Sequence, residues 1–233
     1  MKKPKEVENY ASPAMKARRE RILEQTRELI SEQGVSGFSL LELCRRADVA
    51  KRTLYYAFQS KEGLVAAAII DFAERYDKLI AIRSPVGTVE RFVERLVGVG
   101  KRNLKIRNYV GALVATYFSH SQENGIREAL TNVSVRAHGG LVEELAKQNQ
   151  LQPWIDITQL NNDLVSERLC VSHDWVNNRL RDDELIDHMV VRTLTFLLGA
   201  VRDKSRRHIE DVLTEVIAIG AEAYAAKIAQ DAK

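Results

Sequence analysis

The stretch FSLLELCRRADVAKRTLYYAFQSKE, residues 38–62, decides the fold, because it predicts two short helices joined by a tight turn, with a third helix opening behind them. Ser39 and Glu42 stand three residues apart ahead of an apolar run. We therefore expect a capping box, in which the serine oxygen accepts from the Glu42 amide and the carboxylate reaches back to the serine amide. Phe38 can pack on Leu43 beside this cap, so the first helix is expected to begin at Ser39.

Residues 48–50 form the predicted turn, because Asp48 tolerates a left-handed backbone. The second helix covers residues 51–58, with Leu54 and Phe58 as its apolar anchors. Two cations, a hydroxyl and two phenols occupy the rest of its surface. A helix laid in the DNA major groove uses such groups to hold phosphates and to contact base edges and thymine methyls.

The run VAKRTLYYAFQSKEGL, residues 49–64, resembles the helix-turn-helix signature of the tetracycline-repressor (TetR) family, and the upstream ILEQTRELISEQG is similar to the family's first helix. The resemblance implies an all-α protein, with an N-terminal three-helix DNA-binding domain and a larger C-terminal helical domain for ligand binding and dimerisation. The matching residues are Val49, Thr53, Leu54, Tyr55, Tyr56, Phe58, Ser60, Lys61, Glu62 and Leu64.

Four positions depart from the family's usual pattern. Asp48 stands where Gly is usual, and Ala50 stands where a serine cap is usual. Ala57 and Leu41 replace polar residues, and at Leu41 several members carry an arginine that reads a base. Lys61 matches the family's phosphate-contacting lysine, and its place in the first turn of a helix capped by Ser60 favours phosphate binding. The expected DNA contacts are Arg18, Arg19, Ser39, Lys51, Arg52, Thr53, Tyr55, Tyr56 and Lys61.

Composition and charge are consistent with this interpretation. The chain has 233 residues with 45% apolar content, enough for a sizeable core. No apolar run reaches the roughly 18 residues of a membrane span, and the N-terminus lacks a secretory h-region, so we expect a cytoplasmic protein. Residues 1–62 hold 13 Lys and Arg against 9 Asp and Glu, whereas the remainder holds 22 against 23. The positive excess therefore lies with the predicted DNA-binding end.

No pattern of an enzyme, a metal site or a cofactor site is present. The five histidines form no HxxxH or HxH pair, and no phosphate loop, dinucleotide motif or nucleophile elbow occurs. Cys44 and Cys170 lie far apart, which favours two ordinary thiols over a disulfide, with redox sensing as the alternative. The sequence predicts a protein that is not an enzyme and carries no cofactor.

Three domains are predicted. Residues 1–13 are expected to be a disordered basic arm, whose Lys2, Lys3 and Lys5 either solubilise the chain or enter a minor groove. Residues 14–60 are the helix-turn-helix domain; the cations that open its first helix form either a solvated face or a phosphate clamp. Residues 61–233 are the predicted effector-binding and dimerisation domain.

The fourth helix is expected to run from Ser60 to about Ile82, long enough to leave the DNA-binding domain and act as a transmission lever. Beyond it, further helices are expected. Their approximate ranges are residues 88–97, 108–120, 125–148, 157–169, a piece near 175, 182–201 and 205–229.

The last two predicted helices carry wide apolar stripes and small residues, which favours a two-fold interface that closes into a four-helix bundle. The alternative is that they cover the core of the monomer. The expected interface residues are Met189, Thr193, Leu197, Val212, Val216 and Gly220.

Ring-bearing residues cluster in the sixth helix and in residues 154–180. Core packing is one interpretation; the other is an apolar pocket for a small lipophilic or aromatic effector, which rests mainly on the family resemblance. The expected pocket residues are Phe92, Tyr109, Tyr117, Phe118, His120, Trp154, Trp175 and Phe196.

The sequence therefore predicts a homodimeric regulator of transcription that binds palindromic double-stranded operator DNA, most simply a repressor released by a small-molecule effector. It predicts no membrane partner. Two alternatives stay open: an effector-independent DNA-binding protein of the nucleoid or cell-division type, and a small-molecule or acyl-group binding protein without operator binding.

Overall fold

The computed structural model describes residues 12–119, 124–138 and 140–231, and these form twelve helices and no strand. The predicted all-α fold is confirmed. The predicted basic arm lies outside the described residues up to residue 11, and so does His120. The helices are α1 (Pro13–Gly37), α2 (Leu40–Ala47), α3 (Lys51–Phe58), α4 (Lys61–Asp77), α5 (Val89–Lys105), α6 (Arg107–Phe118), α7 (Asn124–Ala137), α8 (Leu141–Lys147), α9 (Ile157–Val176), α10 (Leu185–Leu198), α11 (Asp203–Ile219) and α12 (Ala221–Asp231).

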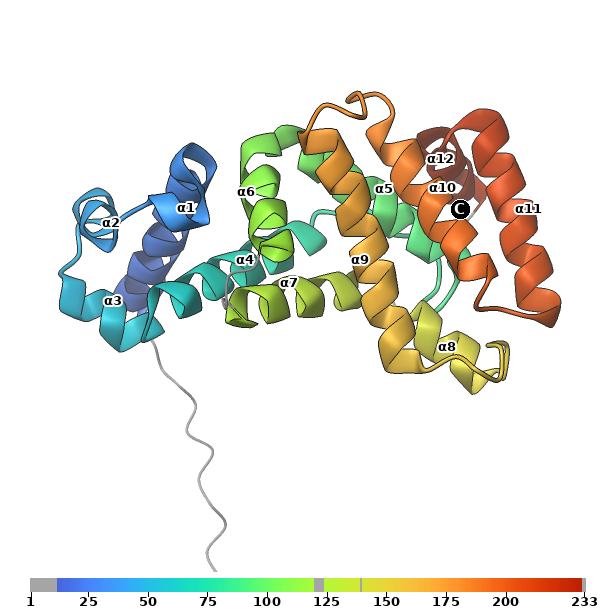
Figure 1. Cartoon of the computed structure of the whole chain (residues 1–233), viewed down its shortest axis with the longest axis horizontal. Coiled ribbons are helices and arrows are strands. Elements are labelled where there is room, and N and C mark those ends of the chain that lie inside the picture. Colours follow the sequence, from blue (N-terminus) through green and yellow to red (C-terminus); the bar gives the residue numbers. More distant parts are fainter. Residues whose placement is uncertain (1–11, 120–123, 139, 232–233) are drawn as a thin grey trace, which may run out of the picture.

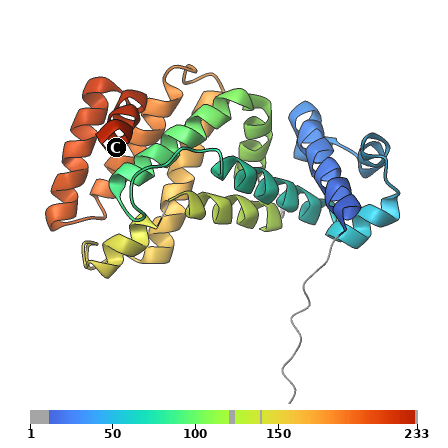
Figure 2. The ribbon, with the colours of Figure 1, turned by 180° about the vertical axis from the view of Figure 1, so that it is seen from behind.

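Helices α1, α2 and α3 form a head at one end of the molecule, and α4 runs from the head into a larger helical body (Figure 1). Seen from behind, α6 and α7 lie between the head and the remaining helices (Figure 2). One hydrophobic cluster joins the head to this neighbouring layer, because it contains buried residues of α1–α4 together with Leu113 of α6 and Ile126 of α7. The head is thus coupled to the body by packing as well as by the chain.

The start of α2 confirms half of the predicted capping box. Ser39 Oγ accepts from the Glu42 amide at 3.1 Å. The Glu42 carboxylate does not return to the serine amide; it accepts from Arg46 instead, at 2.8 Å from Nη2. Arg46 also pairs with Glu32 of α1 at 2.7 Å, so the carboxylate connects α2 to α1 through a shared cation. Asp48 adopts the predicted left-handed conformation, with φ 49°.

Gly34 interrupts α1. Its φ of 76° and ψ of 171° are non-helical, and the chain then makes a short further turn to Gly37. At the other end, Pro13 occupies the first turn behind Ser12, whose hydroxyl accepts from the Met15 amide at 3.3 Å. Both ends therefore follow the usual preference for Pro at a helix start and Gly at a helix stop.

Helix α4 ends at Asp77, several residues before the predicted end near Ile82. The side chain of Ile80 packs so closely on Gly98 of α5 that a Cβ there would lie 2.7 Å from it. The carboxylate of Glu94 accepts from the backbone amides of Arg83 and Ser84, at 3.1 and 3.0 Å. A buried acid on α5 therefore holds the chain in a turn where apolar periodicity alone predicted continuing helix.

Three further predicted boundaries were wrong. The single helix predicted over residues 125–148 is two helices, because Gly140 has φ 77° between α7 and α8. The single helix predicted over residues 205–229 is likewise divided into α11 and α12 at Gly220, which has φ 87°. Residues 157–176, predicted as two pieces, form the continuous helix α9. Its buried face contains polar residues, which interrupted the apolar pattern.

Candidate nucleic-acid interface and effector cavity

Helix α3 presents its polar side chains outward on an apolar base. Leu54 and Phe58 are buried in the core of the head. Tyr56 is 89% exposed and Tyr55 is 46% exposed. The exposed residues of α3 are Lys51, Arg52, Tyr55, Tyr56 and Ala57, whereas Thr53 is half-buried. All four predicted cations and phenols of α3 therefore lie on its solvent-facing side.

Other predicted DNA contacts flank this surface. Arg18 and Arg19 are exposed on α1, and the guanidinium of Arg19 lies 4.7 Å from the centre of the Phe58 ring. This contact holds a cation close to the end of α3. Ser39 is exposed, but its hydroxyl caps α2. Leu41 is 77% exposed on α2, where it offers an apolar surface in place of a hydrogen-bonding side chain.

Lys61 occupies the first position of α4 and is engaged within the head. Its ammonium donates to the carbonyls of Phe38 and Ser36, at 2.8 and 3.2 Å, and lies 4.2 Å from the centre of the Phe38 ring. These contacts fasten the start of α4 to the segment between α1 and α2. A phosphate contact by Lys61 would have to share the ammonium with these carbonyls.

The start of α4 is also tied to the body. The carboxylate of Glu62 accepts from the amide of Gly125, the second residue of α7, at 2.6 Å. Near the middle of α4, Asp71 pairs with Arg27 of α1 at 3.0 Å. Helix α4 thus has polar links to both the head and the body along its length.

A cavity of about 80 Å³ lies among α4, α5, α6, α7 and α9. Most of its wall is apolar, and a smaller set of polar side chains interrupts it. Those polar lining residues are Asp77, Arg102, Asn103, Tyr109, Ser134, Arg168 and Ser172. Because Ile69, Phe72, Ala73 and Asp77 all come from α4, the helix that leaves the head forms one wall of the cavity.

Two arginines dominate the electrostatics of the cavity: Arg168 is buried and Arg102 is half-buried. Burial, together with the positive charge of Arg102, lowers the pKa of Arg168 to about 10. Burial also lowers the pKa of Arg102. Tyr109 has its pKa raised by burial, and its hydroxyl has no hydrogen-bond partner among the described residues. The largely apolar cavity wall therefore also presents a hydrogen-bond donor, the Tyr109 hydroxyl, and the positive charges of Arg102 and Arg168.

Of the predicted pocket residues that the structure describes, only Tyr109 lines this cavity. Phe92 is in the body core, edge-on to His138, and Trp175 is fully buried with its indole donating to Asp182 at 2.8 Å. Trp154 and Phe196 are exposed, at 74% and 40%, along a groove between α9 and α10. The described ring-bearing residues therefore lie in several different places in the fold. The remaining pair, Tyr117 and Phe118, stack edge to face at 5.1 Å outside the cavity lining.

The prediction missed Arg102 and Arg168 because charged residues usually lie on the surface. A signal was present for Arg168, which recurs at helical spacing with the apolar residues of α9. The buried face of that helix consists of Leu160, Asn161, Leu164, Val165, Arg168, Val171, Ser172 and Trp175.

Five of the six predicted interface residues lie inside the monomer, and the sixth, Gly220, is half-buried. Met189, Thr193 and Leu197 of α10 are at most 1% exposed, and Val212 and Val216 of α11 are at most 4% exposed. Gly220 forms the break between α11 and α12. A second chain could not touch these side chains without opening the core. The alternative interpretation, that they cover the core of the monomer, is the one that the structure supports.

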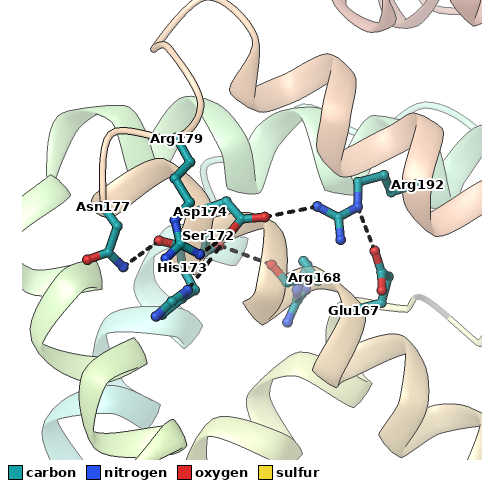
Figure 3. A network of polar contacts seen from close by, with 8 residues as sticks. All are labelled: Glu167, Arg168, Ser172, His173, Asp174, Asn177, Arg179 and Arg192. Carbon is teal, nitrogen blue, oxygen red and sulfur yellow. Dashed lines mark hydrogen bonds and ion pairs between the residues drawn. The ribbon is translucent and has the colours of Figure 1, made fainter.

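The outer side of α9 and α10 carries a network of ion pairs (Figure 3). Arg192 of α10 donates to Glu167 at 2.8 Å and to Asp174 at 3.3 Å, both on α9. Arg179 adds a second cation to Asp174 at 3.3 Å. These pairs hold the two helices side by side. The groove with Trp154 and Phe196 lies on the same two helices.

The geometry defines a class: a small helix-turn-helix head on a larger helical body that encloses a cavity. Comparison with known proteins agrees. Residues 22–68 match the family model described as bacterial regulatory proteins, tetR family. The resemblance predicted from the sequence is thus confirmed, and the head of this chain is similar to the DNA-binding domain of TetR-family regulators.

Curated relatives match over the same end of the chain. The HTH-type transcriptional regulator UidR of Escherichia coli K12 is 37% identical over 79 residues, which are 34% of this chain and 39% of UidR. The HTH-type transcriptional repressor KstR of Rhodococcus jostii is 40% identical over 70 residues, 30% of this chain and 33% of KstR. The chain therefore spans less than half the length of the curated relatives it matches.

The fold likeness extends further than the sequence likeness. The solved structure of TylP, a TetR regulator from Streptomyces fradiae, superposes with a TM-score of 0.60 over 91% of this chain and 99% of its own, at 15% identity. This likeness establishes the shared fold of head and body. None of the helices within the described residues is long and apolar enough to cross a membrane.

Proposed function

We propose that this chain is a homodimeric, sequence-specific repressor of transcription, which acts in the cytoplasm and is released from operator DNA by a small molecule. One observation carries the proposal: α3 exposes Lys51, Arg52, Tyr55 and Tyr56 while its apolar side packs into the head. An α-helix fits the major groove, and these side chains supply phosphate contacts and base-edge contacts. Residues 14–60 would bind DNA, and residues 61–233 would hold the effector and the dimer interface.

The side chains proposed to contact DNA bases belong to α3 and to Leu41 of α2. Ala50 caps α3 without a side-chain hydrogen bond, and Ala57 is exposed without a polar group. Discrimination would therefore depend on Lys51, Arg52 and the two tyrosines, with apolar contact to thymine methyls from Leu41. Arg18 and Arg19 would hold the adjacent phosphates.

Coupling of the cavity to the head would run through α4. This helix forms one wall of the cavity and begins at the Lys61 contacts in the head. A pocket for a drug-sized ligand usually has at least about 300 Å³. Since this cavity has about 80 Å³, a bound molecule of ordinary size would displace α4 from α6 and α9. Such a ligand favours DNA release only to the extent that it binds the conformation with α4 displaced more tightly than the DNA-binding conformation.

The dimer would form through the exposed side of α9 and α10. Trp154, Ile157 and Phe196 are exposed apolar side chains on or beside these helices, at 74%, 42% and 40%. A two-fold interface buries the same patch of both chains, and aromatic side chains are enriched at the centres of interfaces. Pairing of two heads would then present two α3 helices to paired half-sites.

The proposal is tested by fluorescence anisotropy with DNA that flanks the chain's own gene and with a scrambled duplex. We expect selective, salt-dependent binding to the flanking DNA. Tyr56→Ala is the sharpest variant, because the side chain is 89% exposed and supports no core packing. It should weaken selective binding about tenfold or more, while Leu79→Ala, at an exposed position of the body, should not. Unchanged affinity in Tyr56→Ala would reject the assigned reading surface.

A further inference from the structure

Arg168 is a buried cation that forms no ion pair with the described residues. Its residue is 6% exposed, and its Nη1 atom is buried with no hydrogen-bond partner among the described residues. No ion pair to its guanidinium is formed within that part of the chain. Buried charges are normally paired, since desolvation without compensation is unfavourable. The position of Arg168 in the cavity wall indicates that its partner is a molecule in the cavity.

The nearby acids are committed to other cations. Glu167 and Asp174, on the same helix as Arg168, both accept from Arg192 of α10 (Figure 3). Asp77, the one carboxylate among the described lining residues of the cavity, pairs with Arg95 at 2.9 Å. The described acids around this helix are therefore paired with other cations, and Asp77 acts on Arg168 through its charge without forming an ion pair with it.

Arg102 adds a second positive charge to the same wall. Its guanidinium lies 5.8 Å from the Phe72 ring centre and 5.5 Å from the Tyr76 ring centre, and it reaches Asn103 Oδ1 at 3.3 Å. Aromatic faces and an amide oxygen stabilise a cation without neutralising it. The buried hydroxyl of Tyr109 provides a further hydrogen-bond donor without a partner.

We propose that the cavity binds a small organic carboxylate with a compact apolar body, whose carboxylate pairs with Arg168 beside Arg102 and Tyr109. The guanidinium fork matches the two oxygens of a carboxylate. A monoanion fits better than a phosphate ester, because a second negative charge would also have to leave water for a largely apolar cavity. Because the cavity has only about 80 Å³, even a short chain or a single ring would displace α4, as the proposed release from DNA requires. This inference rests on the proposed function, in which the same molecule is the effector.

The experiment is isothermal titration calorimetry on the full chain without DNA. The probes are benzoate, 3-phenylpropionate and hexanoate, each compared with its own primary amide. We expect at least one acid to bind, with its amide binding about tenfold more weakly or worse, because the amide keeps the shape and lacks the charge.

Two variants locate the binding. Arg168→Gln should weaken binding of that acid about tenfold to a hundredfold. Arg102→Gln gives an independent test if the first variant does not fold, as judged by circular dichroism. Arg207→Gln, at an exposed position on α11, is the matched control and should bind like the wild type.

Three results would overturn the inference: no binding of any of the three acids at about 1 mM, equal binding of acid and amide, or undiminished binding in folded Arg168→Gln and Arg102→Gln. Because no DNA is present, each of these results would reject the ligand class and leave operator binding to its own test. Loss of operator binding with intact carboxylate binding would reject the proposed function instead.

Discussion

Replacing Arg168 with methionine should stabilise the ligand-free protein. Burial holds the pKa of Arg168 at about 10, below its ordinary value of 12.5. At about 1.4 kcal/mol for each tenfold change in acidity, the charged form is destabilised by about 3 kcal/mol in the folded chain. Methionine keeps an unbranched apolar side chain of similar reach and removes the charge. After some loss of packing, we expect the free energy of unfolding to rise by about 1–3 kcal/mol.

The assay is urea unfolding followed by circular dichroism at one fixed protein concentration, because a dimer's stability depends on concentration. Arg192→Met is the matched control: it removes the guanidinium that pairs with Glu167 and Asp174 on the outside of α9. Those pairs are partly exposed, so this control should lose about 0–1 kcal/mol. If Arg168→Met instead destabilised the chain by more than about 1 kcal/mol, Arg168 would be making favourable contacts within the protein, and the argument for a missing anion would fail.

Three further predictions follow from single positions. Burial lowers the pKa of His138 from 6.5 to about 4. Between these pH values the unfolded chain binds more protons than the folded chain, so the free energy of unfolding should fall as the pH is lowered, by about 2 kcal/mol at pH 5. The urea midpoint of His138→Asn should lack this pH dependence. Phe196→Glu should shift sedimentation from dimer to monomer while leaving helicity intact, whereas Ile217→Glu, also exposed, should stay dimeric; a dimeric Phe196→Glu would place the interface elsewhere. Gly220→Ala should lower the thermal midpoint, because φ 87° with ψ 150° is strained for any residue with a Cβ, at about 1–3 kcal/mol; an unchanged midpoint would contradict this.

The head was predictable because its signals are local. The N-cap of α2, the left-handed Asp48 and the apolar anchors of α3 each depend on residues within one or two helical turns. Capping preferences and apolar spacing fix such elements before any tertiary contact forms. The capping box shows the limit of local signals. The Glu42 carboxylate pairs with Arg46 in place of the Ser39 amide, and Arg46 is also paired with Glu32 of α1.

The body was less predictable because its boundaries depend on contacts between distant segments. Helix α4 ends where the residues that follow it contact α5, through the Glu94 carboxylate and the surface of Gly98. The sequence around Asp77 contains no helix-breaking residue that would mark this end. Helix α9 appeared broken because the polar residues Arg168 and Ser172 lie on its inward face and interrupt the run of apolar residues. The cavity escaped prediction for the same reason. The groups that define its chemistry are the cations Arg168 and Arg102, which contribute nothing to an apolar or aromatic pattern.

The most direct test of the central claim is a protection footprint of the wild-type chain on the DNA that flanks its own gene. Two α3 helices on one dimer should protect two half-sites separated by about one helical turn or a multiple of it, and the protection should disappear with Tyr56→Ala at the same concentration. Protection of a single unpaired site, no protection at concentrations where the chain is folded and dimeric, or an unchanged pattern with Tyr56→Ala would contradict the proposal that paired α3 surfaces read the operator.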